Sequence, residues 1–227
     1  MSTIGCIPTS EFDPELALSL LEEAGWVDID DDGILECQGC LYSETVDASY
    51  EGTKFEFDLL TNAGNVIRES AGETIRAQLA EVGIVVNYQA IEFGTLVSEL
   101  LGQQYDAIII GWNLGLPFTP DMKWNLGVAA DRPGAGFNTG SFYNEEFENV
   151  LDMANALPAA DDGSYGACDP DQRDQLYARA QQIAWEEQPY LFLFATNVMQ
   201  AAQGNIDGWD PVPYNVDWNI DAWSVGN

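Results

Sequence analysis

The spacing of apolar residues predicts a chain that alternates helices and strands. Asp13 and Pro14 are typical of a helix start, and apolar residues then recur at helical spacing as far as Gly25. The expected inner face of this helix comprises Leu16, Leu20, Leu21 and Ala24. An acid-rich, glycine-punctuated segment occupies 26–52, and alternating apolar residues at 55–59 then predict a strand.

The next segment predicts a β-α-β unit. Asn65 can cap a helix that ends at Gly83, and an apolar strand follows at 84–88. The expected inner face of the helix comprises Ile67, Ala71, Ile75, Leu79 and Val82. The crossover is expected to be right-handed, so that the two strands are parallel.

A second short helix at 95–101 leads into the apolar stretch 105–111. A continuous apolar strand of this kind is typical of the middle of a helix-covered sheet, and its length is far below that of a membrane span. The stretch 112–141 has no sustained periodicity, so we expect loops beyond the carboxyl end of a central strand, where open α/β sheets bind ligands.

Two helices and a strand are predicted after these loops. The first helix covers 144–156, and the second begins at Asp169–Pro170 and ends before Pro189. The inner face expected for the second helix comprises Leu176, Ala180, Ile183 and Ala184. A strand at 190–194 and an irregular tail complete the chain, which is therefore expected to have an α/β fold.

The net charge of the chain excludes some classes of binding partner. The 227 residues include 38 acidic and 7 basic side chains and no histidine, which gives a formal net charge of -31. Phosphate backbones and anionic membranes would repel such a chain, so we exclude nucleic acid as a partner. The excess charge also repels itself unless salt or bound cations screen it. Both a solubilising acidic surface and adaptation to a salty medium account for this composition.

The most specific local motif is an acidic loop with carboxylates at alternate positions before Gly33. Such spacing can wrap a chain around Ca²⁺, which takes six to eight oxygen ligands. The candidate ligands, with a backbone carbonyl at the isoleucine, are Asp28, Asp30, Asp32, Ile34 and Glu36. The loop departs from the EF-hand because its twelfth position is Gly39 rather than glutamate. An acidic turn that needs no metal is the alternative.

Four cysteines are present: Cys6, Cys37, Cys40 and Cys168. Their even number favours at least one disulfide in an oxidising compartment, and Cys37 and Cys40 are close enough to close a small loop. Zinc is disfavoured because the chain lacks a second Cys-x-x-Cys motif and any histidine. Free thiols are the third alternative.

Catalysis is disfavoured. Without histidine, Ser-His and Cys-His nucleophilic sites cannot form. Pairs of carboxylates could hydrolyse glycosides, yet among 38 acids some pair always has a suitable separation, so this signal carries little information. We therefore expect a binding protein rather than an enzyme. A solute pocket needs apolar walls and a few polar groups, for which the candidates are Trp112, Asn113, Asp121, Trp124, Phe137 and Asn138.

An ordered series of phrases points to a family. They are Leu20-Leu21-Glu22-Glu23-Ala24-Gly25-Trp26, Thr61-Asn62-Ala63-Gly64-Asn65 with Arg68, Tyr105-Asp106-Ala107, Gly111-Trp112, Phe137-Asn138-Thr139-Gly140, Tyr143-Asn144-Glu145-Glu146-Phe147, Leu176-Tyr177 and Glu187-Gln188-Pro189-Tyr190. In this order and at these spacings, the chain resembles the C-terminal half of the family 5 extracellular solute-binding proteins, the oligopeptide- and dipeptide-binding components of ABC transporters.

The resemblance implies a three-layer α/β/α lobe with a mixed, mostly parallel sheet, as in type II periplasmic binding proteins. It also implies a two-lobed protein about twice this length that closes on its ligand by hinge motion. Residues 1–12 would then be a boundary segment, 13–194 the ligand-binding lobe with 26–52 as an insertion, and 195–227 a return segment towards the other lobe.

The implied function is capture of a peptide or other small solute outside the cytoplasm, in the periplasm or at the cell surface. The implied partners are ABC transporter permease subunits, with the membrane reached only through an upstream anchor. No cofactor is required, and the acidic loop is a candidate site for a structural Ca²⁺. Peptide-binding relatives carry an amine-binding aspartate where this chain has Gly115, although Asp121 could substitute. A calcium-stabilised extracellular interaction module is the alternative function.

Overall fold

The computed structural model describes residues 11–112, 122–132, 136–155, 170–197, 199–212 and 217–226. The elements, in chain order, are α1 (Pro14–Glu23), β1 (Trp26–Val27), β2 (Glu36–Cys37), α2 (Leu41–Thr45), η1 (Ala48–Tyr50), β3 (Glu56–Asn62), α3 (Val66–Ala80), β4 (Val85–Ile91), α4 (Phe93–Gly102), β5 (Ala107–Ile108), α5 (Met122–Leu126), η2 (Val128–Ala130), α6 (Glu145–Asn155), α7 (Pro170–Glu187), β6 (Ile206–Asp207), η3 (Ile220–Ala222) and β7 (Ser224–Val225).

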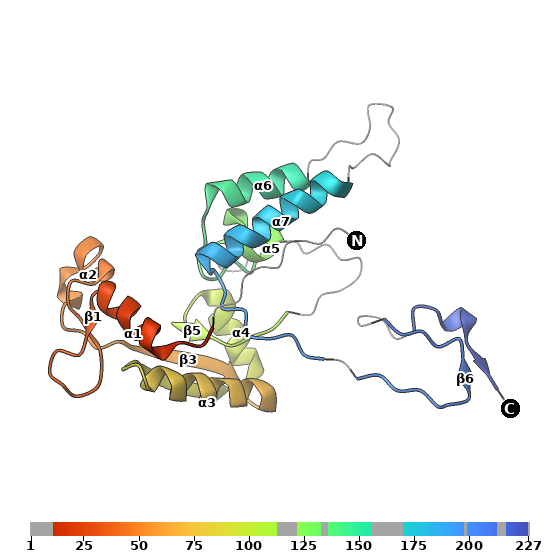
Figure 1. The fold of residues 1–227 in the computed structure, drawn as a ribbon, viewed down its shortest axis with the longest axis horizontal. Helices are drawn as coiled ribbons and strands as arrows, with labels where there is room; N and C mark the ends of the chain where they lie inside the picture. The colour runs from red at the N-terminus through yellow and green to blue at the C-terminus, as the bar shows by residue number, and fades with distance from the viewer. Residues whose placement is uncertain are drawn as a thin grey trace.

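A parallel sheet with the strand order β4-β3-β5 organises the first half of the chain (Figure 1). The pairing of β3 with β4 runs from Glu56 opposite Val85 to Asn62 opposite Ile91. The pairing of β3 with β5 is shorter and places Leu60 opposite Ile108. The two crossovers run in opposite directions across the sheet, so right-handed connections put α3 and α4 on opposite faces. This arrangement confirms the expected three-layer α/β/α lobe.

The predicted helix starts are confirmed by side-chain caps. Asp13 accepts a hydrogen bond from the Leu16 amide at 2.9 Å, and Asn65 accepts one from the Arg68 amide at 3.1 Å. The Asn144 side chain likewise accepts a bond from an amide in the first turn of α6. Each bond satisfies a donor that the helix itself leaves without a partner, which is why these local sequence signals are reliable.

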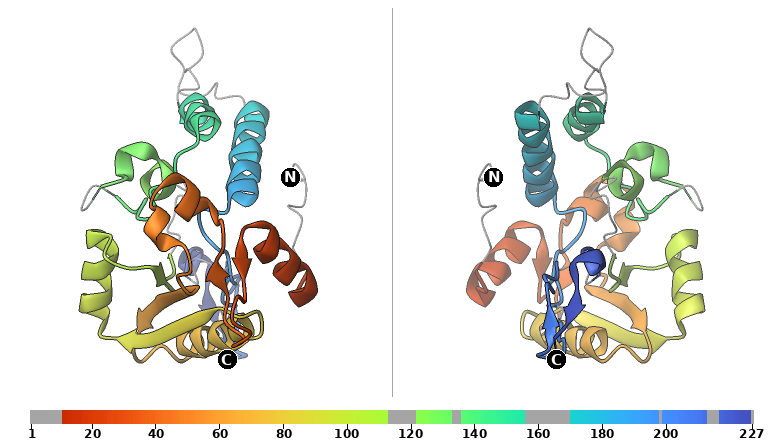
Figure 2. Two further views of the ribbon diagram at one scale, coloured as in Figure 1. Left: turned by 90° about the vertical axis from the view of Figure 1, so that its left-hand side faces the viewer. Right: turned by 90° about the vertical axis from the view of Figure 1, so that its right-hand side faces the viewer.

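Two hydrophobic cores lie in the described residues. The α/β core joins the sheet to α1 and α3, and its buried members are Leu35, Leu59, Val82, Ile84, Val86 and Ile109. The helical core joins α5, α6 and α7, and its buried members are Leu126, Phe147, Val150, Leu151, Ala180, Ile183 and Ala184. The inner face predicted for the last helix is therefore confirmed. Figure 2 shows the helical core beside the sheet rather than on one of its faces.

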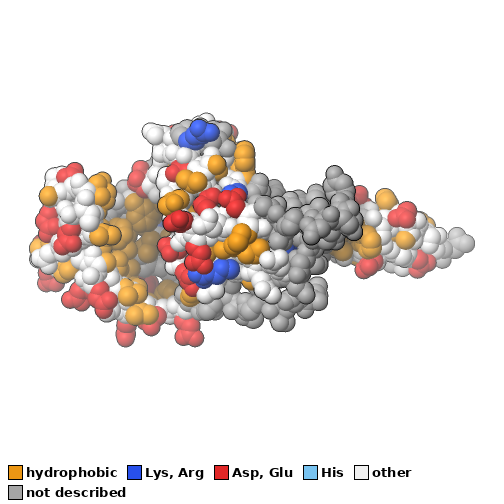
Figure 3. All heavy atoms as spheres, turned by 90° about the horizontal axis from the view of Figure 1, so that it is seen from above, with side chains coloured by type: hydrophobic (Ala, Val, Ile, Leu, Met, Phe, Trp, Pro, Cys, Tyr) orange, Lys and Arg blue, Asp and Glu red, His pale blue; other side chains and the backbone are white. Residues whose placement is uncertain are grey.

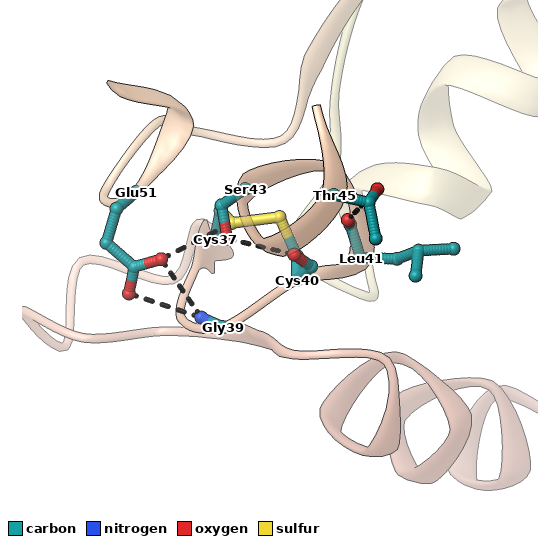
Figure 4. Close-up of a disulfide and its surroundings, with 7 residues drawn as sticks. All are labelled: Cys37, Gly39, Cys40, Leu41, Ser43, Thr45 and Glu51. Carbon is teal, nitrogen blue, oxygen red and sulfur yellow. Dashed lines mark hydrogen bonds between the residues drawn. A yellow bond between two sulfur atoms is a disulfide. The ribbon is translucent and has the colours of Figure 1, made fainter. Parts of the chain in front are cut away.

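The acidic segment 26–52 folds into a small disulfide-linked unit. Strands β1 and β2 pair antiparallel, and the predicted disulfide joins Cys37 to Cys40, both fully buried (Figure 4). Gly25 at the end of α1 has φ +82°, and a Cβ there would lie 2.7 Å from the Cys40 nitrogen. A glycine is therefore needed where α1 meets the disulfide loop.

Two predicted strands differ in the structure. The apolar stretch 105–111 was expected in the middle of the sheet, yet among the described strands β5 is at the edge and only two residues long. The strand predicted at 190–194 does not form, and Leu191 and Phe192 are 77% and 68% exposed. Apolar alternation predicts an extended backbone, but a strand also needs a neighbouring strand for its hydrogen bonds.

Two helix faces also differ from the prediction. Leu16 and Leu20 are more than half exposed, whereas Leu21 contacts the α/β core as predicted, together with Ala17. In α3, Ile67 is 55% exposed. A helix touches a small core along a narrow stripe, so a wide apolar face predicts burial for more residues than the core can cover.

Acidic side chains are spread over the visible face in Figure 3 rather than gathered in one patch. Such mixing is what a highly charged domain needs for solubility. No helix among the described residues is long and apolar enough to cross a membrane.

Gly72 in α3 is a sensitive packing position. A Cβ at this residue would lie 2.2 Å from the Tyr88 ring, whereas a Cβ at Gly102 would meet Gln104 at an ordinary 3.4 Å. We expect Gly72→Ala to lower the free energy of unfolding by about 1–2 kcal/mol through overpacking, despite its better helix propensity. Gly102→Ala, the matched control, should leave stability unchanged or higher in urea unfolding. Equal effects in the two variants would show that α3 does not pack on β4 this closely.

Candidate functional site

An exposed aromatic cluster lies beyond the carboxyl end of β5. The rings of Trp112 and Phe137 have centroids 4.7 Å apart, and Trp124 from α5 meets Phe137 edge-on at 6.0 Å. Trp112 and Trp124 remain 38% and 48% exposed. The structure therefore brings together three of the six residues predicted to contact solute. Ring faces that stay open to solvent can stack on a ligand.

Asn138 is buried beneath this cluster rather than presented at its surface. Its side chain is 1% exposed and donates to the carbonyls of Gly127 at 3.1 Å and Phe142 at 2.9 Å. Its amide oxygen accepts a bond from the Phe142 nitrogen at 3.0 Å. Both donors are thus in use, and the residue holds the loop that carries Phe137 against the start of α6.

Tyr190 fixes the cluster from the other side. Its hydroxyl lies 2.7 Å from the carbonyl oxygen of Phe137 and 2.8 Å from that of Asn125. Burial, with a smaller contribution from Tyr105, raises the pKa of Tyr190 to about 12. The predicted strand 190–194 gave no indication of this role, because a phenol bonding to two distant carbonyls is decided by tertiary contacts.

Arg68 is a second residue that the sequence did not identify as part of the site. Its guanidinium donates to the Asn62 side chain at 2.7 Å, at the carboxyl end of β3. A Cβ at Gly111 would lie 3.0 Å from a guanidinium nitrogen of Arg68, so this glycine leaves room for the Arg68 side chain. Two signals in the sequence pointed to Arg68: the helix start at Asn65, which places it in the first turn of α3, and its place in one of the family phrases.

The predicted residues Asn113 and Asp121 lie outside the described residues, as does Gly115. Hollows of about 430 and 590 Å³ occur elsewhere on the sheet, and neither is lined by Trp112 or Trp124. The described part of the aromatic cluster is an open surface, since Trp112 and Trp124 are 38% and 48% exposed.

The acidic loop between β1 and β2 forms a separate site at the other end of β3. Carboxylate oxygens of Asp28, Asp30 and Glu36 lie within 4.8 Å of one another. Asp32 is not in this group, because it pairs with Lys54 at 2.5 Å. The hydrogen bond from Lys54, followed by one from the backbone of Ile34, lowers the pKa of Asp32. The structure therefore brings together three of the four carboxylates that the spacing predicted as ligands.

Of the four cysteines, Cys37 and Cys40 form the disulfide, while Cys6 and Cys168 lie outside the described residues. The disulfide sulfurs are not available as thiolate ligands, so zinc cannot bind at this pair. Figure 4 shows Gly39 between the two cysteines donating its amide to the Glu51 carboxylate. The pair is structural because its sulfurs are buried and the loop around it is hydrogen-bonded.

Comparison with known proteins gives a consistent result. The profile of the bacterial extracellular solute-binding proteins, family 5 Middle, matches residues 6–132. The oligopeptide-binding protein AppA of Bacillus subtilis is 30% identical over 219 residues, covering 96% of this chain and 35% of AppA. The chain thus spans about a third of the length of the curated relatives it matches.

Solved structures agree with the fold. AppA in complex with a nonapeptide superposes with a TM-score of 0.73 at 28% identity, over 98% of this chain and 39% of AppA. An oligopeptide-binding protein from Thermus thermophilus complexed with a pentapeptide gives a TM-score of 0.62 at 26% identity, over 81% of this chain and 29% of that one. A Thermotoga maritima oligopeptide-binding protein bound to mannohexaose gives 0.65 at 22% identity, over 90% and 35%, which bears on the fold alone.

Replacing Asn138 should destabilise the helical core. In Asn138→Ala, three backbone groups lose their partner in a buried setting, so we expect a loss of roughly 2–4 kcal/mol in the free energy of unfolding. Asn87→Ala, which removes one exposed bond to Glu56, is the matched control and should cost at most about 0.5 kcal/mol. Chemical denaturation followed by circular dichroism measures both. A loss in Asn138→Ala no larger than in the control would contradict the buried role.

The pKa of Tyr190 predicts a loss of stability at high pH. Because folding raises this pKa from 10.0 to about 12, the stabilising contribution of the neutral phenol is complete below pH 10 and is lost as the pH rises towards 12. Absorbance titration of tyrosinate should show a late-titrating component that is smaller in Tyr190→Phe; burial also raises the pKa of Tyr88, which remains in the variant. The fall in stability over that window should also be shallower in the variant. A wild-type titration without a late group would refute the burial of this phenol.

Proposed function

Because the chain belongs to the bacterial extracellular solute-binding proteins of family 5, we propose that it forms part of the solute-binding component of an ABC transporter. In this role it captures a peptide or another small solute for uptake. The family consists of transport-associated binding proteins and is not an enzyme family. The observation that supports this proposal most directly is the exposed aromatic cluster at the carboxyl edge of a parallel sheet, where open α/β sheets bind ligands.

The open form of the cluster supports binding between two lobes. Solute sites bury most of a ligand's surface, whereas Trp112 and Trp124 line one open wall. In the proposal, residues 13–194 are one lobe and residues 195–227 lead back towards a second one. The exposed apolar run from Leu191 to Phe194 supports this arrangement, because exposed apolar surface of this kind is typical of an interaction site.

The proposed setting follows from the same family. The protein works outside the cytoplasm, in the periplasm or at the cell surface, and delivers its solute to permease subunits. A membrane anchor upstream of these residues would hold it there. The buried disulfide between Cys37 and Cys40 supports an oxidising compartment.

The solute class that we propose first is a peptide. AppA and the Thermus thermophilus protein are peptide complexes at 28% and 26% identity, which supports peptide capture here. Gly115 stands where the resemblance implied an amine-binding acid, so we assign recognition to aromatic contacts and the peptide backbone, with Asp121 as the candidate partner for an amine.

Solute capture in this proposal needs no cofactor, and a cation bound at the acidic loop has a structural role only. The loop is at the amino end of β3 and the aromatic cluster is beyond the carboxyl ends of the strands. A seven-residue strand separates the two sites by roughly 20 Å. A calcium-stabilised module without a small-molecule ligand is not supported by the family match.

Truncating Trp112 tests the proposal. In the full-length protein, Trp112→Ala should weaken binding of a peptide ligand at least about tenfold, since buried aromatic anchors dominate binding energies. Trp218→Ala is the matched control, because this tryptophan is 52% exposed on the C-terminal segment away from the sheet, and it should leave affinity unchanged. Isothermal titration with a peptide library and with oligosaccharides measures affinity and class together. Equal affinities in both variants would place the site elsewhere.

A further inference from the structure

The acidic loop has the geometry of a cation site. Two oxygens bound to one Ca²⁺ at about 2.3–2.6 Å stand at most about 5 Å apart. The oxygens offered by Asp28, Asp30 and Glu36 are all within 4.8 Å of one another, so one ion can touch all three. Three carboxylates this close repel each other strongly without a positive charge between them.

Glu36 supplies an independent observation. It is 5% exposed, and its Oε2 accepts a hydrogen bond from the Ile29 amide at 3.0 Å. Its Oε1 is buried without any hydrogen-bond partner, and the Lys54 ammonium, 3.9 Å away, forms only a long ion pair with it. A buried carboxylate oxygen that accepts no hydrogen bond is costly, because a distant ion pair offsets only part of its desolvation. A bound ion would satisfy this oxygen.

The remaining ligands are held in place before any ion arrives. Asp28 accepts amide bonds from Asp32 at 3.1 Å and from Gly33 at 2.8 Å, one on each oxygen. Each of these oxygens keeps a second lone pair for a cation. Asp30 is exposed and supplies the open side of the site, through which water ligands could complete the coordination shell.

We propose that Asp28, Asp30 and Glu36 bind one hard divalent cation of the calcium class, with Lys54 held beside the site by Asp32 rather than inside it. The ligand set thus differs from the five groups that the spacing predicted. Asp32 acts on Lys54, and the Ile34 amide donates to Asp32 at 2.9 Å, which tightens the turn. Oxygen ligands alone favour a hard cation over softer metals, and Ca²⁺ accepts irregular ligand geometry more readily than Mg²⁺, which requires a near-ideal octahedron.

Binding at this position would stabilise the base of the lobe. Glu36 lies in β2, opposite Val27 of β1, and bridges to Lys54 just before β3. An ion held by Asp28 and Glu36 therefore ties the β1–β2 hairpin to its own loop. It also offsets part of a large net negative charge.

Calorimetry of the full chain with CaCl₂ tests this proposal, using NaCl at equal ionic strength as the reference. We expect saturable binding of one Ca²⁺ at or below about millimolar concentration, and a higher melting temperature with calcium. Mg²⁺ should bind more weakly. Glu36→Gln and Asp30→Asn should each weaken Ca²⁺ binding at least about tenfold. Asp30→Asn changes an exposed side chain, so it tests the site even where Glu36→Gln folds poorly.

Asp31→Asn is the matched control. It removes the same charge from the same loop, its residue lies outside the three-oxygen group, and asparagine tolerates the φ of 64° at this position. Its Ca²⁺ affinity should stay within about twofold of the wild type. No binding heat and no calcium-specific rise in melting temperature would overturn the proposal. An equal loss in Asp31→Asn would also overturn it, by showing diffuse screening rather than a site.

Discussion

The parallel pairing of β3 with a strand on each side is the constraint on which the rest of the lobe depends. Its crossovers run in opposite directions and therefore require a helix on each face, which creates the three layers. The pairing also gathers the carboxyl ends of three strands at one edge, beside Trp112. At the opposite end, Lys54 lies just before β3 and bridges to Glu36, so the length of β3 separates the aromatic cluster from the acidic loop.

Buried polar groups make the aromatic edge rigid. Asn138 and Tyr190 bond to backbone atoms of the segments that carry Trp124 and Phe137, and neither presents a free donor to solvent. The rings themselves stay exposed. This division suits a binding surface, because a wall that is ordered in advance loses less entropy when a ligand arrives.

Some of the few basic residues lie where elements meet. Arg179 on α7 pairs with Glu146 on α6, and Lys123 on α5 contacts Glu148 on α6 at 3.5 Å. Exposed pairs of this kind contribute little individually, but they remove repulsion between elements that are otherwise acidic. The cation site inferred at the acidic loop would serve the same purpose where three carboxylates meet.

The sequence by itself determined the local features: the helix caps at Asp13 and Asn65 and the β-α-β order. It also favoured a disulfide, and the structure fixed the pairing as Cys37 with Cys40. These local features depend on interactions between residues that are near one another in the chain, so a short stretch of sequence contains everything needed to predict them. Only the tertiary structure decided that β5 is an edge strand. It also decided that Asp32 pairs with Lys54, 22 residues away, and does not join the cluster formed by the other three carboxylates. Such outcomes rest on contacts between segments that are distant in the chain. The periodicity and spacing of residues do not reveal which distant segments will meet.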